Sequence, residues 1–127
     1  MSEIVGKSYP PVKIGIEEAH VRAFAEAIGA DPDAGVPPTY AAVYALFATA
    51  VQLYGDPEAA VDFAHLLHSE QEFTWEHHPE VGDQVIATGT VEEDVDRRNL
   101  RFLTYATAVT SDGSPLCGSR MVNVIRG

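Results

Sequence analysis

The clearest feature of the hydrophobic pattern is an uncharged run over residues 36–55, VPPTYAAVYALFATAVQLYG. Its larger apolar side chains recur at the i, i+3 and i+4 spacing of a helix, and most positions between them are alanine. Pro37 and Pro38 favour a helix start with Thr39 as the N-cap, and Gly55 favours a helix end. Because a helix that is apolar on all sides must be buried on all sides, the pattern predicts a central helix inside the domain.

The sequence on either side of this run predicts a second helix and an antiparallel sheet. Residues 17–28 are expected to form an amphipathic helix that ends at Gly29. Its apolar face consists of Val21, Phe24, Ala25 and Ile28. Alternating apolar positions and clusters of Pro, Gly, Asn and Asp define the other elements. Extended segments are expected at 4–9, 12–16, 67–76, 84–92, 100–110 and 116–125, turns at 79–83, 96–99 and 111–114, and a loop with one helical turn at 58–66.

This order of elements predicts the α+β class. A helix that is apolar on all sides needs a sheet wrapped around it, and the four consecutive antiparallel strands that follow can supply that sheet. We therefore expect residues 1–127 to form a single domain with the hot-dog fold, in which an antiparallel sheet wraps around a long buried central helix. A chain of 127 residues is large enough for such a core.

The charge of the chain excludes several classes of partner. The formal net charge is −11 and the isoelectric point is about 4.6. Nucleic acid and anionic membrane surfaces would repel such a chain, so neither is an expected partner. A helix of about 16 residues that carries Gln52 and tyrosines is also too short and too polar for a membrane span.

The single cysteine and the N-terminal segment indicate the compartment. Cys117 has no second cysteine with which to form an intrachain disulfide, which suits a reducing environment. It lies in an alternating apolar segment, so we expect a packed thiol and not a nucleophile. Residues 1–13 lack the long apolar core of a secretory signal. The expected localisation is therefore cytoplasmic.

Five short motifs in order along the chain resemble those of one family. They are IVGK (4–7), FAEAIG (24–29), VPPTY (36–40), LHSEQEF (67–73) and HHPEVGD (77–83). Together they resemble the N-terminal, FAS1-like dehydratase branch of the MaoC-like dehydratases, and the resemblance covers nearly the whole chain. It implies the hot-dog fold that the hydrophobic pattern predicts.

The resemblance also implies a role in fatty acid metabolism. Members of this branch resemble the non-catalytic subunit of two-subunit (R)-specific enoyl-thioester hydratases. These enzymes add water to trans-2-enoyl-CoA or enoyl-ACP, or remove it from the 3-hydroxyacyl thioester. Their catalytic subunit carries an Asp and a His in a D-x-N-P-x-H loop, as a general acid/base pair around one water. The implied partners are an acyl-CoA or acyl-ACP thioester and a homologous catalytic subunit, or a second copy of this chain in a dimer. No cofactor is implied.

The loop before the central helix departs from the catalytic motif. Residues 30–36 read ADPDAGV, no histidine follows within the motif, and Pro37-Pro38 stands where the catalytic branch has His-Gly. Asp31 is a candidate catalytic acid, although a residue of the turn after the first helix is the favoured interpretation. The loop is also shorter than is typical, so we expect the mouth of an acyl channel to be wider or to be covered by a partner.

The candidate site residues lie at the start of the central helix and on the strand after it. Backbone N–H groups near Thr39 and Tyr40 are placed to contact a thioester carbonyl. His68 is both a candidate catalytic residue and a candidate ligand contact, and Gln71 is expected on the same strand face as Trp75. The full set of candidate acyl-binding residues is Pro38, Thr39, Tyr40, Tyr44, His68, Gln71 and Trp75. Each also has a structural interpretation, as a core side chain, a cap or a satisfied hydrogen-bonding group.

Three functions remain open from the sequence. The favoured one is a non-catalytic acyl-binding subunit with little or no activity alone. The others are a homodimeric acyl-thioester-binding protein without turnover, and a hydratase or thioesterase that uses Asp31 or His68 in an unusual arrangement. The histidines lack the spacing of a zinc site, so no metal is expected. Arg97, Arg98 and Arg101 near one predicted hairpin, and Arg120 on a strand, could contact a CoA phosphate, although solvated surface is the favoured interpretation.

Overall fold

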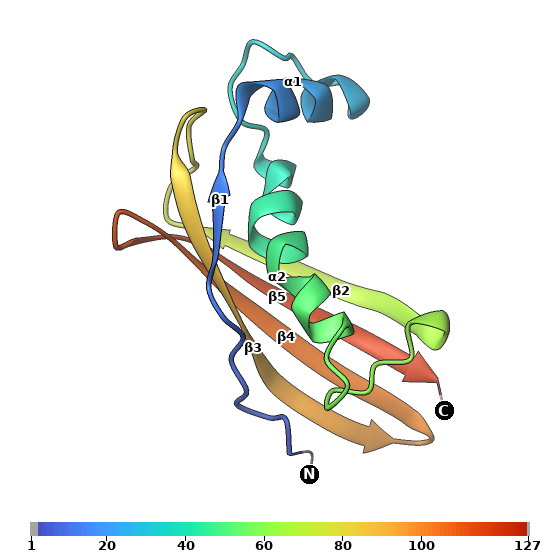
Figure 1. Cartoon of the computed structure of the whole chain (residues 1–127). Coiled ribbons are helices and arrows are strands. Elements are labelled where there is room, and N and C mark those ends of the chain that lie inside the picture. The colour runs from blue at the N-terminus through green and yellow to red at the C-terminus, as the bar shows by residue number, and fades with distance from the viewer. Residues whose placement is uncertain (1–2, 127) are drawn as a thin grey trace.

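The computed structural model describes residues 3–126 and has an antiparallel five-stranded sheet with the strand order β1-β3-β4-β5-β2. The strands are β1 (Val12–Gly15), β2 (Leu66–Trp75), β3 (Gln84–Arg97), β4 (Leu100–Ser111) and β5 (Ser114–Arg126). The helices are α1 (Glu18–Ala27), a 3₁₀ turn at Pro38–Tyr40, a π-helical segment at Ala42–Phe47, α2 (Ala48–Tyr54) and a 3₁₀ turn at Phe63–His65. The sheet wraps around the helical stretch 38–54, called the central helix below (Figure 1). The prediction of an α+β hot-dog fold is confirmed.

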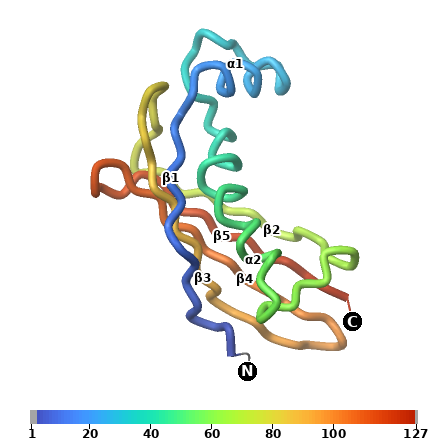
Figure 2. The backbone as a smooth tube through the Cα atoms, viewed as in Figure 1, coloured from blue at the N-terminus to red at the C-terminus, as the bar shows by residue number. Residues whose placement is uncertain are grey.

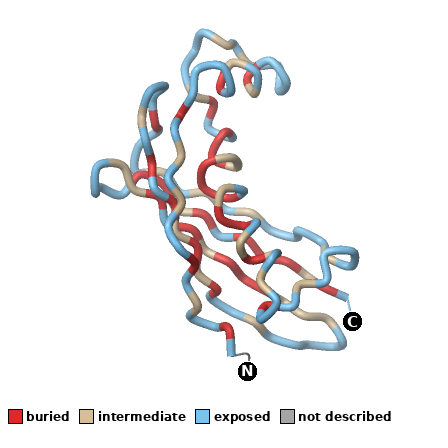
Figure 3. Tube along the Cα trace, viewed as in Figure 1, coloured by how far each residue is buried: buried red, intermediate tan, exposed pale blue. Residues whose placement is uncertain are grey.

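The central helix runs across the face of the sheet from the end near α1 toward the β3–β4 hairpin (Figure 2). Its inner side is buried against the sheet, with Tyr44, Ala45 and Leu53 at most 1 % exposed. Its outer side is open, because Phe47 is 57 % exposed and Val51 is 65 % exposed. The prediction of burial on all sides is therefore wrong for this chain by itself, since one sheet covers one side of a helix. Figure 3 shows buried, intermediate and exposed residues alternating along this helix.

The first helix and the chain ends differ from expectation in detail. The predicted amphipathic helix is confirmed as α1, with Val21 and Ala25 buried. Ile28 is 50 % exposed because it lies at the C-cap, beyond the buried face, and Gly29 follows with φ +76°. Residues 3–6 form turns and not the expected extended segment. Among residues 3–126, no helix combines the length and the apolar character that crossing a membrane requires.

The hairpins explain how far the strands extend. β3 continues to Arg97, past the predicted end at residue 92, because a register shift between Val91 and Glu93 lets pairing with β4 continue. The predicted turn at 96–99 is reduced to Arg98 and Asn99, with φ +55° and +66°. The predicted hairpin at 111–114 is confirmed, and its turn residues also have positive φ.

A polar cluster ties the N-terminal segment to the end of the central helix. The Asp56 carboxylate accepts hydrogen bonds from Lys7 Nζ and from the Tyr9 hydroxyl, both at 2.7 Å. Its other oxygen accepts the Glu58 backbone N–H at 2.9 Å. These bonds, led by that from Lys7, lower the pKa of Asp56 from 3.8 to about 2. The cluster fixes where the central helix ends and the chain turns toward β2.

Gly89 of β3 allows the closest approach between the sheet and the central helix. A Cβ atom at this position would overlap the Tyr105 phenol and lie 2.9 Å from Thr49 Oγ1. The Tyr105 hydroxyl instead lies over the glycine and donates a hydrogen bond to the Thr49 carbonyl at 3.3 Å. A side chain on β4 thereby reaches the central helix across a neighbouring strand.

We expect Gly89→Ala to destabilise the protein by about 1–3 kcal/mol, because the added methyl forces the Tyr105 ring out of its buried position. Urea unfolding measures this change. Gly118→Ala is the matched control in β5, where a Cβ atom would meet its nearest neighbour at 3.9 Å. Equal stability of the two variants would contradict the close-approach interpretation.

The polar cluster predicts a specific acid sensitivity. Because the pKa of Asp56 is lower in the folded chain than in the unfolded one, its ionised carboxylate stabilises the fold above about pH 4, and this contribution disappears as the pH falls toward 2. Asp56→Asn should be less stable than wild type at pH 7, and the difference in urea midpoint should shrink between pH 4 and pH 2. Lys7→Met removes the main cause of the lowered pKa of Asp56. In this variant the stabilisation by the Asp56 carboxylate should therefore disappear at a higher pH than in wild type. A constant difference from pH 6 to pH 2 would overturn the prediction.

Candidate functional site

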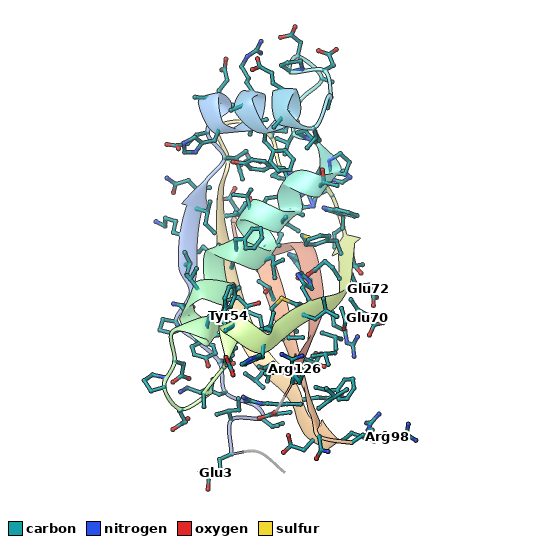
Figure 4. All side chains as sticks on the ribbon, turned by 90° about the vertical axis from the view of Figure 1, so that its right-hand side faces the viewer. Glu3, Tyr54, Glu70, Glu72, Arg98 and Arg126 are labelled. Carbon is teal, nitrogen blue, oxygen red and sulfur yellow. The ribbon has the colours of Figure 1, made fainter. Side chains whose placement is uncertain are left out.

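Strand β2 presents one face to the central helix and the other to solvent. The pairing of β2 with β5 places Gln71 opposite Met121, and every second residue after Gln71 follows it to the helix side. Gln71, Phe73 and Trp75 are partly buried, as the alternation predicts. Figure 4 shows Glu70 and Glu72 pointing away from the domain. Because β2 is an edge strand, its outer backbone edge faces no other strand of residues 3–126.

An aromatic cluster links the start of the central helix to the end of β2. The Trp75 indole N–H donates a hydrogen bond to the Tyr44 hydroxyl at 3.3 Å. The Tyr44 ring lies 6.2 Å from the Tyr40 ring, which in turn packs edge-on against Phe24. Burial raises the pKa of the Tyr44 phenol and of the neighbouring Cys117 thiol. Tyr40, Tyr44 and Trp75 are therefore brought together as one cluster, with uncharged polar atoms inside it.

The first turn of the central helix differs from the predicted cap. Pro37 occupies the N-cap position, so the prediction that Thr39 is the N-cap is wrong. Proline suits these positions because its missing N–H would have no partner in the first turn. Pro38 and Thr39 are exposed there, whereas Tyr40 is 3 % exposed. The exposed pair marks an accessible helix start, next to the aromatic cluster.

A line of polar side chains enters the domain from the start of β2. His68 Nε2 lies 3.0 Å from the Gln71 side-chain oxygen. The Gln71 amide donates to Ser119 Oγ at 2.9 Å and to the Glu72 carbonyl at 3.1 Å. His68 and Gln71 are both predicted site residues, and the structure joins them. Ser119 is absent from the predicted set, although the alternation of β5 places it on the helix side.

Further polar groups lie deeper under the central helix. Thr49 Oγ1 is 3.5 Å from Thr107 Oγ1, and the Tyr54 hydroxyl donates to the Asn123 side-chain oxygen at 3.4 Å. Asn123 is fully buried and lies opposite His68 in the register. Within the described part of the chain its Nδ2 has no hydrogen-bond partner. A buried amide without a partner costs about 1–3 kcal/mol, so this group marks a place where a water or a polar ligand atom would be bound.

The two candidate catalytic residues lie in different parts of the molecule. The Asp31 carboxylate accepts the Asp33 backbone N–H at 2.9 Å, as the turn interpretation requires. This turn lies between α1 and the central helix, whereas His68 is the third residue of β2. Figure 1 shows the segment after α1 and the start of β2 at opposite ends of the central helix. The structure therefore does not bring Asp31 and His68 together as an acid/base pair. In residues 3–126, no group of three or more His, Cys, Asp or Glu side chains is arranged to hold a metal ion.

Two hollows open at the β3–β4 end of the domain. They measure about 830 and 740 Å³, and neither is lined by a residue of the predicted acyl-binding set. The predicted residues instead line the junction between β2 and the central helix. Phe47, on the outer side of the central helix, is open to solvent.

Comparison with known proteins gives one family and one fold. Residues 3–118 match the family model described as FAS1-like, dehydratase domain region. An uncharacterised-family (UPF0336) protein of Saccharopolyspora erythraea is 28 % identical, with 97 % of this chain and 89 % of that protein covered. Two complexes from Mycobacterium tuberculosis share the fold. The HadBC (3R-hydroxyacyl-ACP dehydratase) complex gives a TM-score of 0.78 at 17 % identity, covering 97 % of this chain and 98 % of that chain. The ChsH1–ChsH2 complex gives 0.71 at 12 %, covering 94 % and 84 %.

The aromatic cluster predicts energetic coupling between β2 and the central helix. Trp75→Phe removes the donor to the buried Tyr44 hydroxyl, and Tyr44→Phe removes the acceptor. In a double-mutant cycle by urea unfolding we expect a coupling free energy of about 1 kcal/mol. Trp75→Phe combined with Tyr54→Phe is the matched control and should be additive, because the Tyr54 hydroxyl bonds elsewhere. Additivity of the Trp75–Tyr44 pair would show that the bond does not stabilise the fold.

Proposed function

The chain belongs to the FAS1-like dehydratase domain family, and from this premise we propose that it is the non-catalytic, acyl-binding subunit of an (R)-specific enoyl-thioester hydratase. Hydration of an enoyl thioester needs an acid/base pair that holds one water next to the double bond. The observation that carries the proposal is the separation of Asp31, held in its own turn, from His68, held by Gln71 on β2. A catalytic partner subunit would supply the acid and the base.

The open side of the central helix and the free edge of β2 support pairing with a related subunit. Phe47 and Val51 lie one helical turn apart on the exposed side, and Leu67 of β2 is 65 % exposed. An unpaired edge strand beside exposed apolar side chains is suited to extending the sheet into another hot-dog domain. The partner that best fits this surface is a homologous hot-dog subunit, and a second copy of this chain is the alternative.

The symmetry of such a pair would bring the partner's catalytic loop toward this chain. When two equivalent edge strands pair about a two-fold axis, they run antiparallel. The start of β2 in one subunit then lies beside the end of β2 in the other, where that subunit's central helix begins. The loop that precedes the partner's central helix would therefore face the first residues of this chain's β2, including His68. In this arrangement His68, Gln71 and Asn123 line the wall opposite the partner's acid/base pair.

The proposed wall has a polar end and an apolar end. Gln71, His68 and the buried, unpartnered Asn123 amide suit the polar thioester, because each offers a hydrogen-bonding group. Trp75 and Tyr44 suit the acyl chain. The exposed residues Pro38 and Thr39, with Tyr40 beneath them, would contact a ligand at the helix start.

The test combines activity with pairing. The purified chain should not hydrate crotonyl-CoA or a longer enoyl-CoA, followed by loss of the enoyl absorbance. It should copurify with a MaoC-like subunit of the same organism that carries the Asp/His loop, and the complex should be active. Phe47→Asp should abolish copurification, because it places a charge in the proposed interface. Ile28→Asp, at an apolar side chain of similar exposure at the C-cap of α1, is the matched control and should pair normally.

Other outcomes separate the remaining functions. A stable homodimer that is disrupted by Phe47→Asp, binds an acyl thioester and has no turnover would identify the homodimeric binding protein. Turnover by the pure chain that is lost in His68→Ala or Asp31→Ala would refute the non-catalytic role.

A further inference from the structure

Half of the cationic side chains gather in one hollow at the β3–β4 hairpin. The chain has 8 lysines and arginines, and four of them line the hollow of about 740 Å³: Arg97, Arg98, Arg101 and Arg126. Its acidic lining consists of Asp62 and Asp96. In a chain with a formal net charge of −11, this hollow is therefore a local reversal of charge.

Arg101 forms the fixed wall of this arginine hollow. Its guanidinium makes two bonds to the Asp94 carboxylate, at 2.7 and 3.0 Å, and a third to the Ala60 carbonyl at 3.1 Å. The Asp94 side chain is 8 % exposed, so the pair is largely desolvated. Arg101 is thus occupied within the fold and does not carry the free charge of the hollow.

The other three arginines have no carboxylate partner among residues 3–126. The Arg97 guanidinium lies 5.4 Å from the Phe102 ring, and no ion pair forms at Arg98 or Arg126. Figure 4 shows Arg98 and Arg126 at the same end of the molecule. Outside the hollow, by contrast, the ion-paired cations are Lys7, Arg22 and Arg120. Unpaired arginines in an acidic chain leave their fork of N–H donors free for an anion.

The backbone conformation at the tip of the β3–β4 hairpin indicates that the charge of Arg98 has a function other than forming the turn. Arg98 has φ +55°, a left-handed conformation that glycine adopts without strain and arginine adopts only at a cost. A two-residue turn of this kind favours Asn-Gly, and Asp112-Gly113 at the other hairpin follows that preference more closely. Arginine at this position brings a charge to the mouth of the hollow and does not improve the turn.

We propose that the arginine hollow binds the phosphates of the thioester carrier, as the diphosphate of coenzyme A or the phosphate that joins pantetheine to an acyl carrier protein. This inference rests on the proposed function. Guanidinium groups pair with phosphate through two parallel hydrogen bonds, which suits Arg98 and Arg126. The adjoining hollow shares Arg97 and Arg101 but is also lined by five carboxylates, those of Glu58, Glu92, Glu93, Asp94 and Asp96. Its excess of negative charge repels phosphate and leaves the hairpin side as the approach.

The distance between the hollow and the proposed thioester position suits this ligand. His68 lies opposite Asn123 on β5, and Leu66 lies opposite Ile125, which lines the hollow. Gln71 lies opposite Met121, which is five residues from Arg126, or about 17 Å along a strand. An extended pantetheine arm spans that length, so phosphates at Arg126 and a thioester near Gln71 can be held by one carrier.

The experiment measures binding of acyl-free carriers to the full chain by calorimetry at low salt. Coenzyme A should bind more tightly than pantetheine, which has no phosphate. The double variant Arg98→Gln, Arg126→Gln should weaken binding of coenzyme A by about tenfold or more, and leave pantetheine unaffected. Arg120→Gln removes one exposed arginine outside the hollow and is the control for general charge. If the carrier is a protein, holo-acyl carrier protein shows this loss and coenzyme A binds weakly throughout.

The proposal is overturned if neither coenzyme A nor holo-acyl carrier protein loses affinity in the double variant, or if Arg120→Gln causes an equal loss. Binding of crotonyl pantetheine distinguishes failure of the phosphate site from failure of the proposed function, because this compound carries the acyl thioester without phosphates. Its binding should depend on Gln71, tested with Gln71→Leu, and not on the arginines. If crotonyl pantetheine does not bind but coenzyme A still depends on the arginines, the acyl-binding role fails and the phosphate site stands.

Discussion

A single five-stranded sheet covers only one side of the uncharged central helix. This incomplete coverage determines which side chains of the helix are buried and which are exposed. On the covered side, alanines and the Gly89 gap let the helix approach the strands closely, so the core is dense there. On the other side, Phe47 and Val51 remain in contact with water. The core is therefore complete while apolar side chains stay exposed on the helix, and the proposed pairing with a second hot-dog domain would cover them.

The polar groups under the helix are placed by the same geometry. Each strand contributes alternate side chains to the helix side, so the rows that carry apolar side chains also bring Ser119, Thr107 and Asn123 inward. Ser119 and Thr107 find partners within the domain, whereas the Asn123 Nδ2 group has none among residues 3–126. A core made only for stability would gain from an apolar residue at that position. The proposed wall opposite a polar thioester would gain from an amide.

The charges are distributed unevenly over this scaffold. Carboxylates are spread over most of the surface, and Asp56 and Asp94 hold structural ion pairs with Lys7 and Arg101. The arginines left without such pairs lie together at one end of the sheet, beyond the start of β2. The aromatic cluster, the polar groups at His68 and Gln71, and the arginine hollow therefore follow one another along the β2–β5 side of the domain. The polar groups lie between the other two. Their order is that of the acyl chain, thioester and phosphate in an acyl carrier.

Most of the elements and the fold class could be predicted from the sequence, because they depend on local periodicity. Each of these signals depends on only a few neighbouring residues. They are the helical period of the central run, the alternation around Phe73 and Trp75, and the turn residues at 111–114. The family motifs implied the same hot-dog fold as the hydrophobic pattern and pointed to His68 and Gln71 as candidate site residues. The tertiary structure alone decided which of these residues meet. It joined His68 to Gln71 and Trp75 to Tyr44, kept Asp31 in a separate turn, and left one side of the central helix open. These outcomes depend on strand order, register and the area that one sheet can cover, and no short stretch of sequence carries that information.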